Sequence, residues 1–215
     1  MQKIGLVFDC DGTLVDTEDQ VIESIHYALA QINAPDHSTP EIRKLFGPGA
    51  DQILIKLIGD EKLAALPFEH YIEHQKKNVF NMKVYDGIRT LLDELKSMGI
   101  PLGLVTGRHS RDLEIVLNAF ELKKYFYVIV SDDDLKLPKP SPEGLLNAAF
   151  LMKIPLEKIY YIGDAKTDIE TAKAASSLSI AALWDKRVES EVMRMESPTF
   201  MAQSPIDILN YIKNL

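Results

Sequence analysis

Cysteine is almost absent from the sequence, since Cys10 is the single cysteine among 215 residues. A lone cysteine cannot form a disulfide within the chain, and it cannot supply the thiolates of a zinc site. No stretch reaches the roughly 18 uncharged apolar residues that a membrane-spanning helix needs. The apolar run at residues 4–8 is too short for a signal peptide. We therefore expect a cytoplasmic protein that does not enter a membrane.

Positive charge is also scarce, with 24 Lys and Arg against 32 Asp and Glu and a formal net charge of -8. Such a field repels the phosphates of nucleic acids and of anionic membranes. Hydrophobic residues make up 46% of the chain, which is enough for a folded core. The length fits one domain, or one domain with an insertion. We expect a small-molecule partner, and the sequence leaves the oligomeric state open.

Short apolar runs bounded by Asp, Gly or Ser recur along the chain and are typical of buried strands. They lie at residues 4–8, 101–105, 127–130, 159–162 and 179–183. Apolar residues at helical spacing predict helices between the later runs, at 88–98, 111–120, 143–151 and 167–175. Alternation of strand and helix predicts an α/β fold, a Rossmann-like doubly wound parallel sheet.

The long stretch between the first two strands has only helical patterns, at residues 21–32 and 53–58, with a turn at 35–40. At about 65 residues it is far longer than an ordinary connection. It predicts a helical subdomain at residues 17–83. The α/β core domain would then consist of residues 1–16 and 84–215.

The strongest local signal follows the first strand, in the string Asp9-Cys10-Asp11-Gly12-Thr13. Side chains two apart on a strand point the same way, so Asp9 and Asp11 should present two carboxylates to one small volume. Two like charges that close need a cation or a shared proton. Gly12 permits a tight exit whose backbone N–H groups can face an anion. Cys10 alternates to the opposite face and is predicted to be a buried core residue.

Polar groups also follow the other predicted strands: Thr106 and Gly107, then Lys139, then Asp164 and Asp168. Open α/β sheets bind ligands outside the carboxyl ends of their strands, so these groups should converge on one pocket. Carboxylates suit a hard divalent cation, while a lysine and a hydroxyl suit a phosphate. With a carboxylate able to attack phosphorus, the set predicts phosphoryl transfer through an aspartyl phosphate.

Over nearly its whole length, the chain resembles the haloacid dehalogenase superfamily. Four motifs carry the resemblance: Asp9-Cys10-Asp11-Gly12-Thr13, Thr106, Lys139, and Gly163-Asp164 with Asp168. The helical insert is similar to the first-type cap of phosphoglycolate phosphatases and β-phosphoglucomutases. The resemblance implies that Asp9 is the nucleophile, and that Asp11 protonates the leaving alcohol and then activates water.

The resemblance also implies a Mg²⁺ cofactor. The ion would be held by the Asp9 carboxylate, the Asp11 carbonyl and Asp164, with Asp168 as a further ligand or as a partner behind them. Lys139 and Thr106 would hold the transferring phosphoryl group. Further phosphate contacts would come from the residues beside them: Gly12, Thr13 and Gly107.

These assignments predict a Mg²⁺-dependent phosphatase of a small phosphorylated metabolite, with phosphoglycolate as the best guess. A phosphomutase of the same family is the main alternative. Sugar phosphomutases with such caps commonly have a histidine five residues after the acid that matches Asp16, where this chain has Val21. A dehalogenase is disfavoured because Asp11 is present. A non-enzymatic phospho-receiver module would be about half as long, with its phosphorylated aspartate on an interior strand.

The predicted insert contains one candidate for substrate specificity. Arg43 precedes the turn Gly47-Pro48-Gly49, and it is a hypothetical clamp for a second anionic group on the substrate. The sequence Thr17-Glu18-Asp19-Gln20 has the form of a capping box, which would begin the first insert helix. The insert should then hinge near Asp16 and Tyr85.

Two further patterns have simpler structural interpretations. The acidic run at residues 132–134 is predicted to be a solvated loop. His70 and His74 have i, i+4 spacing but no third ligand nearby, so we expect an exposed helix face and no metal site.

Overall fold

The computed structural model describes residues 4–215, and its centre is a six-stranded parallel sheet with the order β5-β4-β1-β6-β7-β8. The strands are β1 (Gly5–Phe8), β4 (Leu102–Val105), β5 (Val128–Val130), β6 (Ile159–Gly163), β7 (Leu178–Ala182) and β8 (Phe200–Ala202). The first five confirm the predicted strands with shifts of about one residue at their ends, and β8 was not predicted. The order places β1 in the interior and confirms the doubly wound α/β fold.

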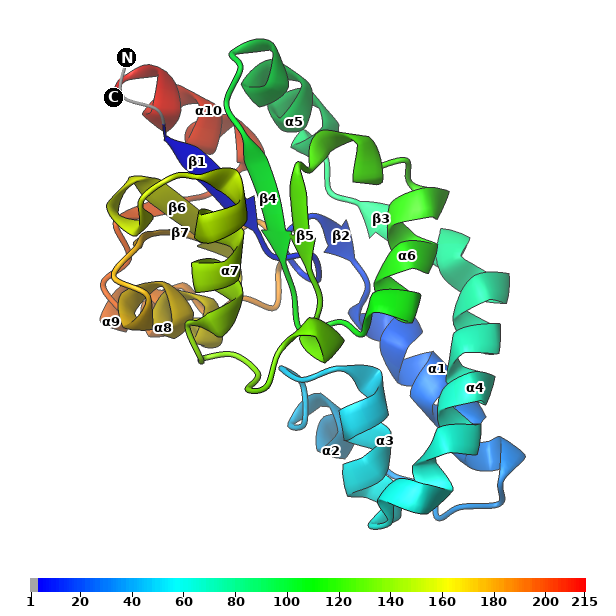
Figure 1. Cartoon of the computed structure of the whole chain (residues 1–215). Helices are drawn as coiled ribbons and strands as arrows, with labels where there is room; N and C mark the ends of the chain where they lie inside the picture. The colour runs from blue at the N-terminus through cyan, green and yellow to red at the C-terminus, as the bar shows by residue number, and fades with distance from the viewer. Residues whose placement is uncertain (1–3) are drawn as a thin grey trace.

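Helices cover both faces of this sheet (Figure 1). One face packs against α5 (Ile88–Ser97), α6 (Ser110–Ala119) and α10 (Pro205–Lys213). The other packs against α7 (Glu143–Met152) and α8 (Lys166–Ala174), with α9 (Ser190–Met195) beside α8. Short 3-10 turns complete the sheet domain: η2 (Lys123–Tyr125), η3 (Asp132–Asp134) and η4 (Leu156–Lys158). Cys10 is fully buried in the first of these cores, as predicted.

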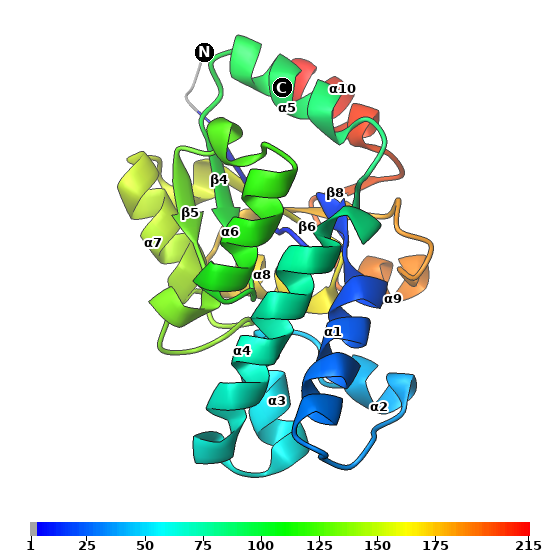
Figure 2. The same ribbon diagram turned by 90° about the vertical axis from the view of Figure 1, so that its right-hand side faces the viewer.

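The remaining helices form an insert between two short strands, β2 (Val15–Asp16) and β3 (Lys83–Val84), which pair with each other in antiparallel fashion. They are α1 (Glu18–Gln31), α2 (Thr39–Arg43), α3 (Ala50–Ile58), α4 (Glu61–Asn78) and the 3-10 turn η1 (Val79–Asn81). Helices α1 to α4 share a hydrophobic cluster of their own, which includes the buried residues Ile25, Leu54 and Tyr71. Figure 2 shows α1 and α4 side by side below the sheet.

The predicted turn at residues 35–40 is correct only for residues 35–38. Thr39 and Pro40 already belong to α2, because Ser38 caps this helix. The Glu41 carboxylate accepts hydrogen bonds from the Ser38 backbone N–H and hydroxyl, both at 2.8 Å. This pairing is a capping box, and it allows a proline in the first turn, where no N–H partner is needed.

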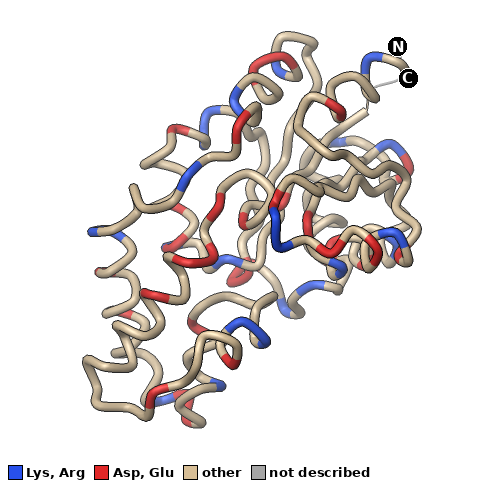
Figure 3. Tube along the Cα trace, turned by 180° about the vertical axis from the view of Figure 1, so that it is seen from behind, with Lys and Arg blue, Asp and Glu red and all other residues tan. Residues whose placement is uncertain are grey.

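Charged residues of both signs occur on the sheet domain and on the insert. Figure 3 shows acidic and basic residues interspersed along the junction between them. Ion pairs cross this junction: the Arg111 guanidinium on α6 binds the Glu69 carboxylate on α4 at 2.6 Å, and Arg187 lies 3.9 Å from Glu18 on α1. Within residues 4–215, no helix combines the length and the apolar character that crossing a membrane would require.

Candidate active site

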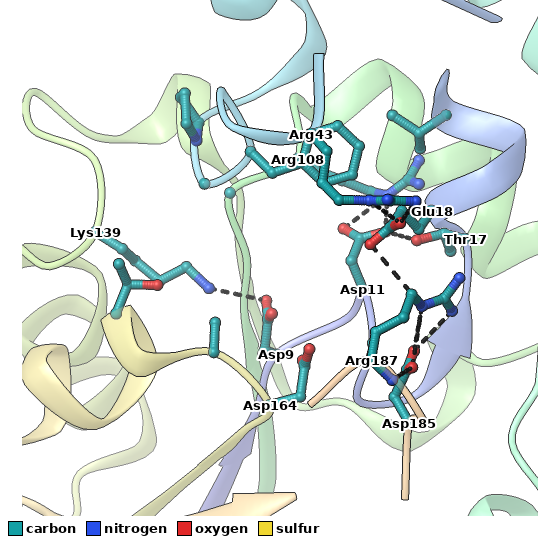
Figure 4. A pocket seen from close by; sticks show the side chains of 18 of the residues that line it. Asp9, Asp11, Thr17, Glu18, Arg43, Arg108, Lys139, Asp164, Asp185 and Arg187 are labelled. Carbon is teal, nitrogen blue, oxygen red and sulfur yellow. Dashed lines mark hydrogen bonds and ion pairs between the residues drawn. The ribbon is translucent and has the colours of Figure 1, made fainter. Parts of the chain in front are cut away.

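Polar segments from several strand ends meet at the carboxyl edge of the sheet, where β1 lies between β4 and β6 (Figure 4). Asp9 follows β1, Arg108 follows β4 and Asp164 follows β6. Together with Lys139 they line a cavity of about 450 Å³, which the helical insert faces from the other side. The strand order reverses at this edge, which is where open α/β sheets form their ligand sites.

A cluster of three carboxylates lies at the cavity floor, with Asp9 and Asp164 lining the cavity and Asp168 fully buried behind them. Oxygens of Asp9, Asp164 and Asp168 all lie within 4.8 Å of one another. Burial, together with the charges of Asp168 and Asp9, holds the pKa of Asp164 well above its usual range, and burial also raises the pKa of Asp9. Asp9 Oδ1 is buried and makes no hydrogen bond, although the Lys139 ammonium forms an ion pair with it at 3.1 Å. Clustered carboxylate oxygens with unmet bonding capacity fit a hard divalent cation.

Two glycines allow these carboxylates to approach the backbone so closely. Gly12 has φ +72°, and a Cβ at this position would collide with the Asp164 carboxylate. A Cβ at Gly163 would collide with Asp168 in the same way. Thr13 contributes from the side, because its hydroxyl donates to Asp164 Oδ1 at 2.7 Å. The Thr13 hydroxyl thus orients a carboxylate, and its contact with phosphate stays a prediction.

Lys139 supplies positive charge beside the cluster. Its Nζ lies 2.7 Å from Asp168 Oδ1 and 3.1 Å from Asp9 Oδ1, and it donates to the Tyr161 hydroxyl at 3.3 Å. Burial opposes its charge, but the two carboxylates outweigh burial and hold the pKa of Lys139 well above its usual range. The ammonium group therefore stays protonated next to Asp9.

Asp11 lines the same cavity but is turned away from the cluster. Strand β1 ends at Phe8, so strand alternation does not extend through Asp9 and Asp11. Both carboxylates line the cavity, as predicted, but Asp11 lies outside the cluster of three. The Asp11 carboxylate accepts from Arg108 Nε at 2.8 and 3.0 Å and from the Thr17 hydroxyl. Figure 4 shows it between Asp9 and the insert.

Thr17 is indeed the residue before α1, but the predicted capping box is absent. Its hydroxyl makes no capping hydrogen bond to the helix and instead donates to Asp11. A hydrogen bond to a charged carboxylate is stronger than one from a neutral backbone N–H, so the hydroxyl points to Asp11 and leaves the helix N–H groups uncapped. A residue at the entrance of the insert thus contacts the candidate acid directly.

Arg108 is a site residue to which the sequence assigned no role. It is 4% exposed, and its Nη1 lies 2.6 Å from Asp112 Oδ2. Burial opposes its charge, but Asp11 and Asp112 hold the pKa of Arg108 well above its usual range. The Tyr71 hydroxyl of α4 donates to Asp112 at 2.7 Å, so this network joins the insert to Asp11. The available signal was its position directly after Gly107 at a strand end.

Thr106 and Gly107 form the end of β4. Thr106 is buried, and its hydroxyl accepts a hydrogen bond from the Arg108 N–H at 3.2 Å. Gly107 touches the insert so closely that a Cβ there would collide with the Gly47 carbonyl oxygen. The insert loop at 47–49 therefore rests on the sheet domain, and the phosphate roles of Thr106 and Gly107 stay predictions.

Two further arginines lie at the insert side of the cavity. Arg43 lines it, and its Nη2 is 2.6 Å from Glu18 Oε1. Arg187 was not predicted, because it follows β7 in an irregular loop without a motif. Its Nη2 donates to Asp185 at 2.7 Å and also to Asp16, so it connects the sheet domain with β2.

Two simpler predictions are corrected by the contacts. The acidic run forms η3, and Asp133 accepts from both the Ser110 N–H and its hydroxyl at 2.6 Å, so the run is not merely a solvated loop. His74 is half-buried between α4 and α1, with its Nδ1 2.8 Å from the Ser24 hydroxyl and its ring stacked on Tyr27. It therefore does not belong to an exposed helix face.

Comparison with known proteins agrees with this architecture. A protein of Caldanaerobacter subterraneus subsp. tengcongensis, provisionally named as the pyrophosphatase PpaX, is 28% identical over 99% of this chain and 96% of its own length. A phosphoglycolate phosphatase of Aquifex aeolicus is 28% identical over 97% of this chain and 96% of its own. The crystal structure of a hydrolase from Pseudomonas syringae covers 99% of both chains with a TM-score of 0.83 and 22% identity, which supports the fold.

A family match covers most of the chain. Residues 6–182 match the haloacid dehalogenase-like hydrolases, a range that begins in β1 and ends with β7. It includes all four motifs on which the sequence resemblance rests, and the resemblance is thereby confirmed. The chain belongs to the haloacid dehalogenase-like hydrolase family.

Proposed function

We propose that this protein is a Mg²⁺-dependent phosphatase that hydrolyses a small phosphate monoester through a phosphoaspartate on Asp9. The observation that carries the proposal is the buried Asp9 carboxylate, 3.1 Å from the Lys139 ammonium and clustered with Asp164 and Asp168. Relatives that cover nearly the whole chain are named phosphoglycolate phosphatases, which supports phosphoric monoester hydrolysis as the reaction class.

Asp9 and Asp164 would hold the Mg²⁺ ion, together with the Asp11 carbonyl that the family resemblance implies. Asp168 is already engaged, because it accepts from Lys139 at 2.7 Å and from the Ala165 N–H at 3.0 Å. We therefore assign Asp168 to the support of Lys139 behind the ligands. When bound, the ion offsets the negative charge of the carboxylates and of the phosphoryl oxygens.

In the first step, an Asp9 carboxylate oxygen attacks phosphorus, and the bond between phosphorus and the leaving oxygen breaks. Asp11 donates a proton to the leaving oxygen, which departs as an alcohol. Lys139 remains positively charged beside Asp9 and offsets charge on the transferring group. The product of this step is the alcohol and a phosphoaspartate at Asp9.

In the second step, water attacks phosphorus while Asp11 takes the proton of that water. The bond between phosphorus and the Asp9 oxygen breaks, which restores the carboxylate and yields inorganic phosphate. Arg108 and Thr17 keep the Asp11 carboxylate at the insert side of Asp9, where the leaving alcohol and then the water must lie. Contact of the insert with the sheet domain limits the access of bulk water.

The test is phosphate release from a panel of phosphate monoesters by the purified protein, with Mg²⁺ and after chelation. We expect release that requires Mg²⁺ and that is absent in Asp9→Asn. Transfer of phosphate between hydroxyls of a sugar phosphate, without release, would indicate a phosphomutase. A stable phosphoaspartate without turnover would indicate a receiver module. Either result would contradict the proposal.

A further inference from the structure

The insert side of the cavity has a largely apolar lining. Side chains from α1, the α2–α3 loop, α3, the loop after β7 and α9 contribute to it. We call them the apolar wall: Val21, Phe46, Pro48, Ile53, Val188 and Val192. These residues line the same cavity as Asp9 and Lys139, so they surround whatever is attached to the transferring phosphoryl group. A leaving group with hydrocarbon surface would displace water from this wall.

The cations that line the cavity are already paired with carboxylates. Arg43 is held by Glu18 at 2.6 Å, and the buried Arg108 is shared by Asp11 at 2.8 Å and Asp112 at 2.6 Å. The two remaining cations outside the floor are paired as well: Arg187 with Asp185 at 2.7 Å and Lys166 with Glu196 at 3.1 Å. Lys139 serves the transferring phosphoryl group. Within residues 4–215, every cation of the lining has a carboxylate partner, although Arg108 Nη2 is buried without a hydrogen bond.

The balance of charge around the leaving group is negative. Outside the floor cluster, the lining contains five acids, Asp11, Glu18, Asp112, Asp185 and Glu189, against four cations, Arg43, Arg108, Lys166 and Arg187. A second anion would meet this excess of carboxylates and would have to displace one of them from its arginine. Both effects lower affinity for a doubly anionic substrate.

From these contacts we infer that the cavity selects phosphate monoesters whose leaving group is uncharged and partly apolar. This inference rests on the proposed phosphatase function and narrows its substrate class. It opposes the hypothesis that Arg43 clamps a second anion, because Glu18 occupies that guanidinium. It also makes phosphoglycolate, with its free carboxylate, a poor substrate.

A matched pair of substrates tests the charge of the leaving group. Phosphoglycolate and its amide have the same shape and differ by one negative charge, so kcat/KM for each is compared at saturating Mg²⁺. We expect the amide to be favoured about tenfold or more, because a carboxylate that enters the cavity loses its hydration without gaining a free cation. A preference for phosphoglycolate would overturn the inference and leave the phosphatase function standing.

A series of methyl, ethyl, propyl and butyl phosphates tests the apolar wall. Burial of each added methylene should raise kcat/KM by about fourfold until the wall is covered. A flat or falling series would overturn the inference, since hydrolysis of any member already satisfies the proposed function. Failure to release phosphate from every monoester, including p-nitrophenyl phosphate, would instead overturn the proposed function and the inference together.

The variant Glu18→Gln tests the charge pairing directly. It removes the partner of Arg43 with little change of shape, so the ratio of kcat/KM for phosphoglycolate to that for its amide should rise about tenfold. The control is Glu23→Gln, which removes an exposed acid of the same helix outside the cavity and should leave this ratio as in the native chain. Loss of phosphoglycolate turnover in Arg43→Ala, with the amide spared, would show that Arg43 is an anion clamp and would overturn the inference.

Discussion

The floor and the apolar wall of the cavity are built in different ways. The floor consists of Asp9 and Asp164 at strand ends, Lys139 in the loop before α7, and Asp168 in the first turn of α8, and these residues are fixed by burial and by opposite charges. The wall is carried by helices and loops, and its charged neighbours are partly exposed pairs such as Arg43 with Glu18. The difference implies a division of labour, in which the floor performs the chemistry and the wall ranks the substrates.

The largest effect should come from a change at the floor. We expect Asp9→Asn to lower turnover by about 10⁴-fold or more, because the amide is a poor nucleophile. Its thermal unfolding midpoint should not fall, since burial already disfavours the Asp9 carboxylate. Phosphate release and thermal denaturation measure the two effects. The exposed Asp86 offers a control, Asp86→Asn, and near-native turnover in a folded Asp9→Asn protein would rule out the mechanism.

Asp11 lies between floor and wall, and its variant should have a smaller and substrate-dependent effect. We expect Asp11→Asn to slow the hydrolysis of butyl phosphate by about 10²- to 10⁴-fold, the usual value of general acid–base catalysis. p-Nitrophenyl phosphate should lose less in the first step, because its leaving group departs without a proton. Single-turnover measurements of alcohol and phenol release compare the two. Equal losses on both would remove Asp11 from the role of acid.

The contact between the insert and the sheet domain can be broken at Gly107. In Gly107→Ala, the new Cβ would collide with the Gly47 carbonyl oxygen. The other atoms nearest to this Cβ are also backbone atoms of the insert, from Gly47 and Pro48. Overpacking of about 1 to 3 kcal/mol should disfavour closure and lower kcat/KM by roughly 5- to 150-fold. Small-angle scattering should show a more open molecule. Thermal denaturation should show an unchanged unfolding midpoint. Native kcat/KM in this variant would mean that turnover does not depend on the contact.

The smallest expected effect concerns the junction itself. Arg187→Met removes hydrogen bonds to Asp185 and Asp16, and its side chain is 23% exposed, so we expect a loss of about 1.5 kcal/mol in the free energy of unfolding. Arg194→Met is the matched control, because its pair with Glu191 is largely exposed and should contribute little. Urea denaturation measures both. Equal losses would show that Arg187 is an ordinary surface residue.

The floor was the part of the site most accessible to sequence reasoning. Asp9, Lys139 and Asp164 each follow a buried strand or a stiff loop, so the topology of the sheet brings them together. The sheet itself was predictable because its strands are continuous apolar runs, with the exception of β8. Only three residues long and incompletely buried, β8 lacks that signal.

The rest depends on side-chain partners that lie far away in the chain. The Thr17 hydroxyl could cap its own helix or bond to Asp11, and it bonds to Asp11 because the fold brings that carboxylate close to it. The same is true of Arg108, whose partner Asp11 lies 97 positions away in the chain, and of Arg187, which meets Asp16 across 171 positions. Local patterns describe which groups can bond, and long-range packing decides which do.

The pairing of β2 with β3 has a consequence for the evolution of proteins with this fold. The chain leaves the sheet domain at Asp16 and returns at Lys83, and these two residues are direct partners in one antiparallel ladder. The entry and exit of the insert are therefore about one strand spacing apart, roughly 5 Å. Helices between these points can be lengthened, shortened or replaced without altering the order or register of the parallel strands. The same catalytic sheet domain can therefore carry different inserts for substrate recognition.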